Sequence, residues 1–258
     1  MTKQAKIYIG ILLLLSVILN YFLAMEGSIK SSLGQTLVVS MMFVPTISYF
    51  ILKLISKEKV DKIKIKFKDW RSIFEAYLLP FVYVSIAYLM IWSLGYYKEN
   101  FTVALLITGV SGTLLNSIGT IGEEIGWRGF LINEFLKKNN ALRSSIIVGL
   151  IWSIWHIPGL IFTDYGNTSN LIYGILFFTI SLTCISIPMS YYVLKARNIW
   201  PAVLMHASHN ALIQSLYEPM TISNKVSQLL KDETGLFLVI MSVTIGIVYG
   251  IKMKKNYA

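Results

Sequence analysis

The chain has 258 residues, of which 55% are hydrophobic and only 14% are charged, and it carries a formal net charge of +10. This composition, with its long apolar runs, is that of a membrane protein. The single cysteine, Cys184, excludes an intramolecular disulfide and a cysteine-based metal cluster.

Eight apolar runs are long enough to cross a hydrocarbon core of about 30 Å, which takes roughly 20 helical residues. They cover residues 7–24, 34–56, 73–96, 101–133, 144–162, 170–194, 201–217 and 235–251. The first run is interpreted as a retained span rather than a cleaved signal peptide, because its core is long and no small-residue cleavage site follows. The predicted fold class is therefore all-α, a polytopic membrane protein of about eight transmembrane helices with a polar intramembrane pocket. Residues 1–100 are predicted to hold the N-terminal transmembrane helices with a basic cytoplasmic loop. Residues 101–258 are predicted to hold a helical core, which contains the polar pocket, and the final transmembrane helix.

The basic residues are unevenly divided between the two sides of the predicted membrane. One side receives 18 of the 23, namely Lys3, Lys6, Lys53, Lys57, Lys59, Lys62, Lys64, Lys66, Lys68, Arg71, Lys137, Lys138, Arg143, Lys195, Arg197, Lys252, Lys254 and Lys255. The other side receives four, and Arg128 lies within a span. This bias follows the positive-inside rule and predicts an integral protein of the bacterial plasma membrane with both termini cytoplasmic. The basic run 57–70 is interpreted as a topology-setting loop that touches anionic lipid headgroups, and no nucleic-acid partner is expected.

Few ionisable residues lie within the spans, and three of them are in "EEIGWR", residues 123–128. A charge at membrane depth costs roughly 2.5–3.5 kcal/mol of insertion free energy, so such residues are expected to be paired and to have a function. Glu124 and Arg128 are four residues apart and can pair on one helix face, while Glu123 points about 100° away. Pairing therefore leaves one carboxylate free.

The fifth run contributes "WSIWH", in which Trp152 and His156 share a helix face. The midpoint between Glu123 and His156 falls at Asn139–Asn140, where the connection between the fourth and fifth runs is expected. In an antiparallel hairpin the carboxylate and the imidazole then reach the same depth.

The seventh run opens with "WPAVLMHASHN", in which Pro201 fits a first helical turn. His206 and Asn210 share a face, with His209 about 60° away. Counted at 1.5 Å per residue from the bounding charges, Glu123, His156 and His206 lie about 16, 20 and 14 Å deep. The similar depths predict one polar pocket, reached from the cytoplasmic side.

These groups provide what amide hydrolysis requires. A glutamate shielded from bulk water is suited to take a proton from a water molecule, and an adjacent imidazole can hold that water. A second imidazole with an asparagine amide can donate to the oxyanion of a tetrahedral intermediate.

Three motifs in order, "EEIGWR", "WSIWH" and "HASHN", resemble the E-E-x-x-x-R, aromatic-x-x-x-His and His-x-x-x-Asn signatures of the CPBP family. This family, also called Abi, comprises CAAX-protease and bacteriocin-processing intramembrane endopeptidases. The resemblance covers about residues 120–210, and Trp152 stands where the family more often has Phe.

The resemblance implies that Glu123 with His156 activates a water, that Glu124 and Arg128 organise the site, and that His206 with Asn210 lines the oxyanion. The expected substrate is a hydrophobic or lipid-anchored peptide. The family has been described both as glutamate and as metal-dependent proteases. A site without metal is favoured, because H-E-x-x-H is absent, although Glu123, His156, His206 and His209 could in principle bind Zn²⁺.

Other chemistries fit the sequence less well. A pair of catalytic aspartates fails, because Asp61, Asp69, Asp164 and Asp232 all fall in loops. A serine enzyme using Ser111 and His206 places Ser111 about 18 Å along the helix from Glu123. Outside catalysis, the same pocket could serve a bacteriocin immunity or peptide-binding protein, or a proton-coupled transporter.

Overall fold

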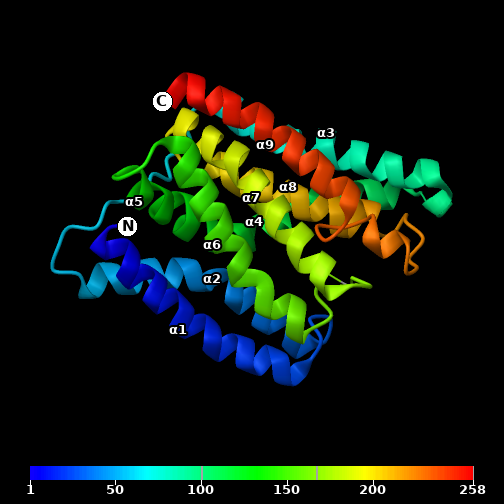
Figure 1. Ribbon diagram of the computed structural model, residues 1–258, viewed down its shortest axis with the longest axis horizontal. Coiled ribbons are helices and arrows are strands. Elements are labelled where there is room, and N and C mark those ends of the chain that lie inside the picture. Colours follow the sequence, from blue (N-terminus) through cyan, green and yellow to red (C-terminus); the bar gives the residue numbers. More distant parts are fainter. Residues whose placement is uncertain (100, 167, 258) are drawn as a thin grey trace.

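In the computed structural model, which describes residues 1–99, 101–166 and 168–257, the chain is almost entirely helical (Figure 1). The α-helices are α1 (Lys3–Glu26), α2 (Ser32–Ile55), α3 (Trp70–Ile91), α4 (Val103–Glu124), α5 (Ile132–Leu136), α6 (Ala141–Phe162), α7 (Leu171–Ala196), α8 (Trp200–Ala211) and α9 (Leu236–Tyr257). Three π-helical turns cover Trp92–Tyr96, Ile125–Leu131 and Leu212–Tyr217, and a 3₁₀ turn covers Ser227–Leu229. In these ranges the only extended pairing is an isolated antiparallel bridge between Tyr97 and Thr221, so the all-α class is confirmed.

Seven helices in the described part of the chain are long and apolar enough to cross a membrane. They are Lys3–Glu26, Ser32–Ile55, Trp70–Tyr96, Val103–Leu136, Ala141–Phe162, Leu171–Ala196 and Leu236–Tyr257. The eighth predicted span, 201–217, does not meet this description and is instead the 12-residue helix α8 followed by a π-helical turn. Nine residues of α8 are buried, and it packs against α3, α4 and α7. Its polar side chains His206, Ser208 and His209 therefore face protein.

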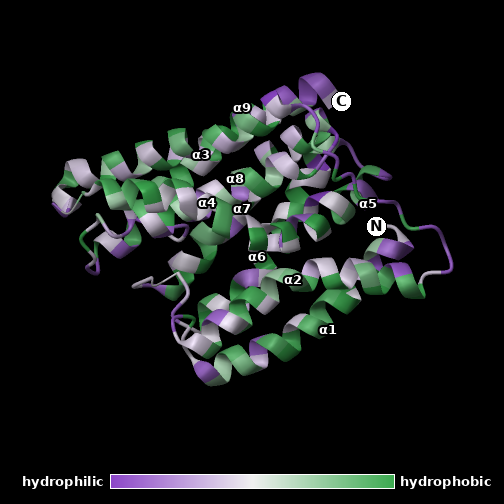
Figure 2. Ribbon diagram, turned by 180° about the vertical axis from the view of Figure 1, so that it is seen from behind, coloured by the Kyte–Doolittle hydropathy of each residue, from purple (hydrophilic) through white to green (hydrophobic). Residues whose placement is uncertain are grey.

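Both chain termini lie at one end of the helix bundle, together with α5 and the connection from α2 to α3 (Figure 1). Hydrophilic residues gather at this end (Figure 2). Two ion pairs join its segments, from Lys3 to Glu58 at 3.9 Å and from Lys137 to Asp61 at 3.1 Å. The flanks that the sequence assigned to one side of the membrane are thus neighbours in space.

Most long helices begin at a side chain that accepts a hydrogen bond from a backbone amide of the first turn. These capping residues are Thr2 of α1, Ser31 of α2, Asp69 of α3, Thr102 of α4, Asn140 of α6 and Asn170 of α7. Such caps satisfy amides that have no partner within the helix. They fix where each helix starts. The start of a helix in turn sets the depth in the bundle at which each of its later residues lies.

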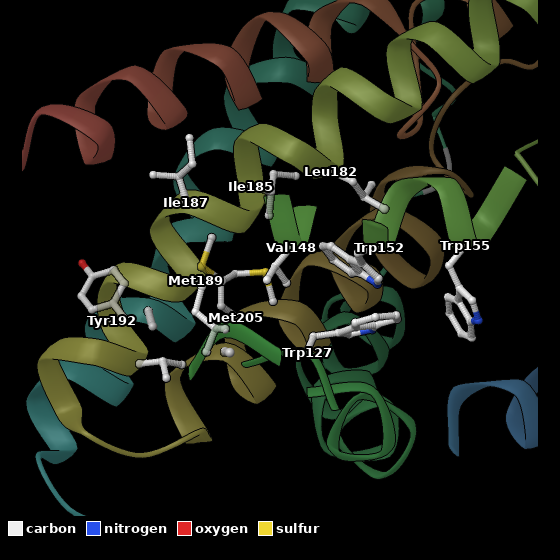
Figure 3. Close-up of a cluster of buried hydrophobic side chains, with 14 of the residues drawn as sticks. Trp127, Val148, Trp152, Trp155, Leu182, Ile185, Ile187, Met189, Tyr192 and Met205 are labelled. Atoms are coloured by element: carbon white, nitrogen blue, oxygen red, sulfur yellow. The ribbon is translucent and has the colours of Figure 1, made fainter. Parts of the chain in front are cut away.

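A cluster of apolar side chains packs α6 and α7 against α8 beside the polar residues (Figure 3). It includes Val148, Ile185, Met189 and Met205, which are all buried. This close packing holds rigid helices on both sides of the candidate site.

The π-helical turn after α4 packs so tightly against α1 and α2 that only glycine fits at position 126. A Cβ atom there would lie 2.3 Å from Tyr8 Oη and 2.4 Å from Pro45 Cβ. The same Tyr8 hydroxyl donates a 3.2 Å hydrogen bond to the Pro45 carbonyl. The close approach joins the α1–α2 pair to the segment that carries Arg128.

Gly126→Ala is therefore expected to lower the free energy of unfolding by about 1–3 kcal/mol, the usual cost of overpacking a core. Titration with SDS in mixed micelles, followed by circular dichroism, measures the change. Gly10→Ala is the matched control, because a Cβ at Gly10 meets nothing within 4 Å. Equal effects of the two substitutions would contradict the tight packing at position 126.

Candidate active site

Glu123 lies at the end of α4 and is only 2% exposed. Its Oε2 atom accepts hydrogen bonds from two indoles, at 2.8 Å from Trp152 Nε1 and at 3.3 Å from Trp127 Nε1. The two tryptophan side chains come from α6 and the π-helical turn, and both belong to the cluster in Figure 3. These bonds hold the carboxylate in one orientation and leave Oε1 without a hydrogen bond to the described residues.

Glu124, the neighbouring carboxylate, is fully buried and contacts a guanidinium and an imidazole. Arg128 Nη1 donates to both of its oxygens, at 2.9 and 3.1 Å. Nδ1 of His206, on α8, lies 3.0 Å from Oε1 of the same carboxylate. The Arg128 guanidinium also lies over the Trp152 ring, 4.3 Å from its centroid. The predicted pairing of Glu124 with Arg128 is thus present, and it extends to His206.

His156 lies on α6, one turn after Trp152. Its Nδ1 atom is 2.9 Å from the Trp152 carbonyl oxygen, so Nδ1 carries the proton in this contact. Nε2 of the neutral ring is then an acceptor that can hold a water molecule. The ring packs edge-on against Trp152 and Trp155, with centroid distances of 5.9 and 4.8 Å.

A cavity of about 370 Å³ brings the predicted residues together. Glu123, His156, His206 and Asn210 all line it, whereas Glu124 and Arg128 lie behind its wall. The juxtaposition comes from α4, α6 and α8. The proposed serine nucleophile Ser111 is exposed and is not part of this lining.

The cavity extends toward the end of the bundle opposite the termini. Ile29, Tyr165 and Glu233, from the connections at that end, line it. In the other direction, Trp127 and Phe130 fill the space after Glu123 and are at most 2% exposed. The lining thus points away from the side of the basic loops, from which access to the pocket was predicted. Depths counted along a helix place a residue between its two ends but do not show toward which end a cavity extends.

The structure adds a second carboxylate, Glu233, and a third imidazole, His209, to the cavity. Glu233 Oε1 lies 3.2 Å from His209 Nε2, and Glu233 Oε2 accepts a 3.3 Å hydrogen bond from the Tyr165 hydroxyl. On its other side, His209 Nδ1 is 2.6 Å from the Tyr83 hydroxyl. Glu233 could not be singled out from the sequence, because "KDETG" has the composition of an ordinary charged connection. Only the folded chain places this connection over the cavity.

Glu233 lines this cavity from the connection between α8 and α9, outside the long membrane-crossing helices. Burial raises the pKa of its carboxyl, but the contact with His209 and the nearby His156 and His206 outweigh burial and leave the pKa below its ordinary value. The side chain is therefore ionised at neutral pH and adds a negative charge at the far end of the cavity.

No group of three or more His, Cys, Asp or Glu side chains within residues 1–99, 101–166 and 168–257 is arranged to hold a metal ion. The four residues that could in principle bind Zn²⁺ are divided between separate contacts. His206 is directed to Glu124, and His209 to Glu233.

Residues 103–212 match the family model Rce1-like, described as type II CAAX prenyl endopeptidase Rce1-like. The chain carries an Rce1-like segment. This segment contains all six predicted site residues, whereas Glu233 lies beyond it. The match confirms the CPBP resemblance inferred from the three motifs.

The chain is also similar to CAAX prenyl protease 2 of Methanococcus maripaludis, with 32% identity over 90 residues. The aligned stretch is 33% of this chain and 32% of that protein, so the chain spans about a third of the curated relative it matches. The similarity thus concerns about a third of each protein.

Proposed function

We propose that this protein is an intramembrane endopeptidase that hydrolyses a peptide bond of a hydrophobic or lipid-anchored peptide. The observation that carries the proposal is one cavity lined by Glu123, His156, His206 and Asn210, four residues that all belong to the Rce1-like segment. An acid, two imidazoles and an amide from three helices meet there, at a depth where isolated charges are costly.

Glu123 acts as the general base. Because the two indoles occupy Oε2, Oε1 is the atom that accepts a proton from water. Nε2 of His156 accepts a hydrogen bond from the other O–H group of that water. This bond directs a lone pair of the water oxygen toward the substrate. The hydroxide then attacks the carbonyl carbon of the scissile bond.

His206 and Asn210 stabilise the oxyanion that this attack produces. Nδ1 of His206 is engaged with Glu124, so the ring can donate from Nε2 only as an imidazolium. With His206 protonated, the charges of Glu123, Glu124, Arg128 and His206 sum to zero, which favours burial of the group. Nδ2 of Asn210 supplies the second donor. The proton taken up by Glu123 then passes to the leaving nitrogen as the C–N bond breaks, which gives a carboxylic acid and an amine. Transfer of the acid proton to the amine leaves a carboxylate and an ammonium group as the products.

The apolar lining favours a substrate that is itself apolar. Val38 and Val39 of α2 and Leu182 and Ile185 of α7 line the cavity, and Val39 is 51% exposed at the surface of the bundle. A peptide held in the bilayer can therefore meet the cavity wall without first entering water. The name of the methanococcal relative makes prenylated CAAX peptides the first substrate to test.

The charge distribution supports a topology with both termini in the cytoplasm, because 18 basic residues flank the helix ends on the side of the termini. Cysteine substitution at Lys254 and at Lys225, followed by labelling of intact cells with an impermeant maleimide, tests this topology. With cytoplasmic termini, only the cysteine at position 225 is labelled. Labelling at position 254 alone would show that the termini face the outside of the cell.

The test of the proposed function is cleavage by the purified full chain in proteoliposomes. The substrate is a farnesylated CAAX peptide carrying a fluorophore, and an unprenylated peptide of equal length serves for comparison. Mass spectrometry identifies the bond that is cut. Peptide retained without any product would favour a binding or immunity protein. Proton-coupled uptake without a product would favour a transporter.

His206→Gln is expected to lower kcat by about 10²–10³-fold with little change in KM, because it removes a charged donor to the oxyanion. His209→Gln is the matched control, since His209 lies on the same helix and lines the same cavity but contacts Glu233 instead. We expect the control to retain activity within about tenfold. Equal losses would remove His206 from the oxyanion site.

A further inference from the structure

A second cavity, of about 300 Å³, lies at the end of the bundle that carries the termini. It is bordered by the connection between α2 and α3, the segment after α4, and the turn between α7 and α8. The polar residues of its lining that matter here are Lys62, Lys64, Arg128, Asn133, Arg197 and Asn198.

The cavity has an excess of positive charge. Lys62, Lys64 and Arg197 are exposed and form no ion pair within the described part of the chain. The one acidic residue of the lining, Asp61, is paired with Lys137 at 3.1 Å. Three cations thus converge on one hollow without a protein anion to neutralise them.

Arg128 forms the inner wall of this cavity and lacks acceptors. Its Nη1 is used by Glu124, but the buried Nε and Nη2 have no hydrogen-bond partner among the described residues. A buried guanidinium with unused donors costs free energy unless an acceptor approaches it. An anion in the adjacent cavity lowers this cost through its field.

Hydrogen bonds between its segments hold the walls of the cavity in place. Asn198 is 2% exposed and donates from Nδ2 to the carbonyl oxygen of Lys68 at 2.9 Å. The amide of Ile199 donates to the Lys64 carbonyl at 3.1 Å, and Trp200 Nε1 donates to the Ile65 carbonyl at 2.8 Å. The turn before α8 therefore fixes the position of the lysine-bearing segment.

The surroundings of the cavity are those of a membrane surface. Lysines and apolar residues alternate from Lys62 to Lys68, and Ile65 and Phe67 are 59% and 63% exposed. Trp70 is also exposed, directly at the start of α3. Aromatic residues at the ends of membrane-crossing helices mark the headgroup level. A cavity beside them is within reach of phospholipid headgroups.

We infer that this cavity binds the phosphate of an anionic membrane phospholipid, held by Lys62, Lys64 and Arg197 in front of Arg128. A phosphodiester supplies the oxygen acceptors and the negative charge that these donors lack. The exposed Ile65 and Phe67 contact the acyl chains of the same leaflet. Binding at this site does not depend on the proposed peptidase activity.

The test is retention of lipid by the full chain in detergent, where no membrane surface potential acts. Native mass spectrometry counts bound phosphatidylglycerol or phosphatidylcholine, and thermal unfolding gives the rise in Tm caused by each lipid. Millimolar inorganic phosphate, with sulfate as a further anion, forms a separate arm. Each variant is compared with its own lipid-free Tm, so that a change in baseline stability does not affect the comparison.

One phosphatidylglycerol should be retained in preference to phosphatidylcholine, and Lys62→Gln with Lys64→Gln should weaken its binding by about tenfold or more. The control, Lys66→Gln with Lys68→Gln, removes the same charge from the same segment outside the cavity and should change binding less than threefold. Arg197→Gln should weaken lipid binding in the same way, whereas Arg143→Gln, at the same end of the bundle, should not.

Equal losses of lipid binding in the two lysine pairs, or equal retention of the two lipids, would overturn the site. Binding of inorganic phosphate as tight as that of the lipid would overturn the assignment to a phospholipid.

Discussion

Glu123→Gln is expected to lower kcat/KM for the cleaved peptide by about 10²–10⁴-fold, the usual contribution of a general base. The amide that replaces the carboxylate keeps nearly the same shape and can still accept from the Trp152 and Trp127 indoles through its oxygen. It has no negative charge with which to take a proton from water. The loss should therefore appear in kcat, with KM nearly unchanged.

Glu233→Gln is the matched control for this experiment, because it makes the same change in another glutamate of the same cavity. Glu233 contacts His209 and Tyr165 rather than the groups around Glu123. We expect the control to keep kcat/KM within about tenfold. If Glu123→Gln retained full activity, the proposed water activation would have to be abandoned.

Arg128→Met is expected to lower the free energy of unfolding by about 3–5 kcal/mol, because it leaves the fully buried Glu124 without its main countercharge. The methionine also loses the stacking of the guanidinium on Trp152. Unfolding in SDS mixed micelles, followed by circular dichroism, measures the difference.

A double-mutant cycle separates the ion pair from the other contacts of Arg128. In Arg128→Met combined with Glu124→Gln, no buried charge is left alone, so most of the lost stability should return. Arg143→Met, an exposed change at the start of α6, should cost less than about 0.5 kcal/mol. Additive effects of the two changes at Glu124 and Arg128 would show that the pair is not coupled.

Much of the helical architecture followed from the sequence. The predicted apolar runs match the helices to within a few residues at most ends, as 34–56 does for α2 and 144–162 for α6. Length and hydropathy determine these segments because a membrane-crossing backbone must satisfy its own hydrogen bonds within a helix. The segment 201–217, which is not among the seven long apolar helices, is α8 with its π-helical turn and packs against α3, α4 and α7.

Local spacing also predicted contacts within one helix. Glu124 and Arg128 pair as their four-residue separation indicates, and Trp152 and His156 pack together on α6. Such contacts depend on helical periodicity alone. The expected antiparallel hairpin placed Glu123 and His156 at the same depth, and both residues line the cavity.

The helices, the clustering of basic residues at one end, and the identity of the groups that are costly in lipid could thus be predicted from the amino-acid sequence. The packing of the helices was needed to show that indoles orient Glu123, that His206 shares Glu124 with Arg128, and that Glu233 contacts His209. Periodicity fixes directions within a helix, whereas contacts between helices and connections depend on how side chains from distant segments fill the same space.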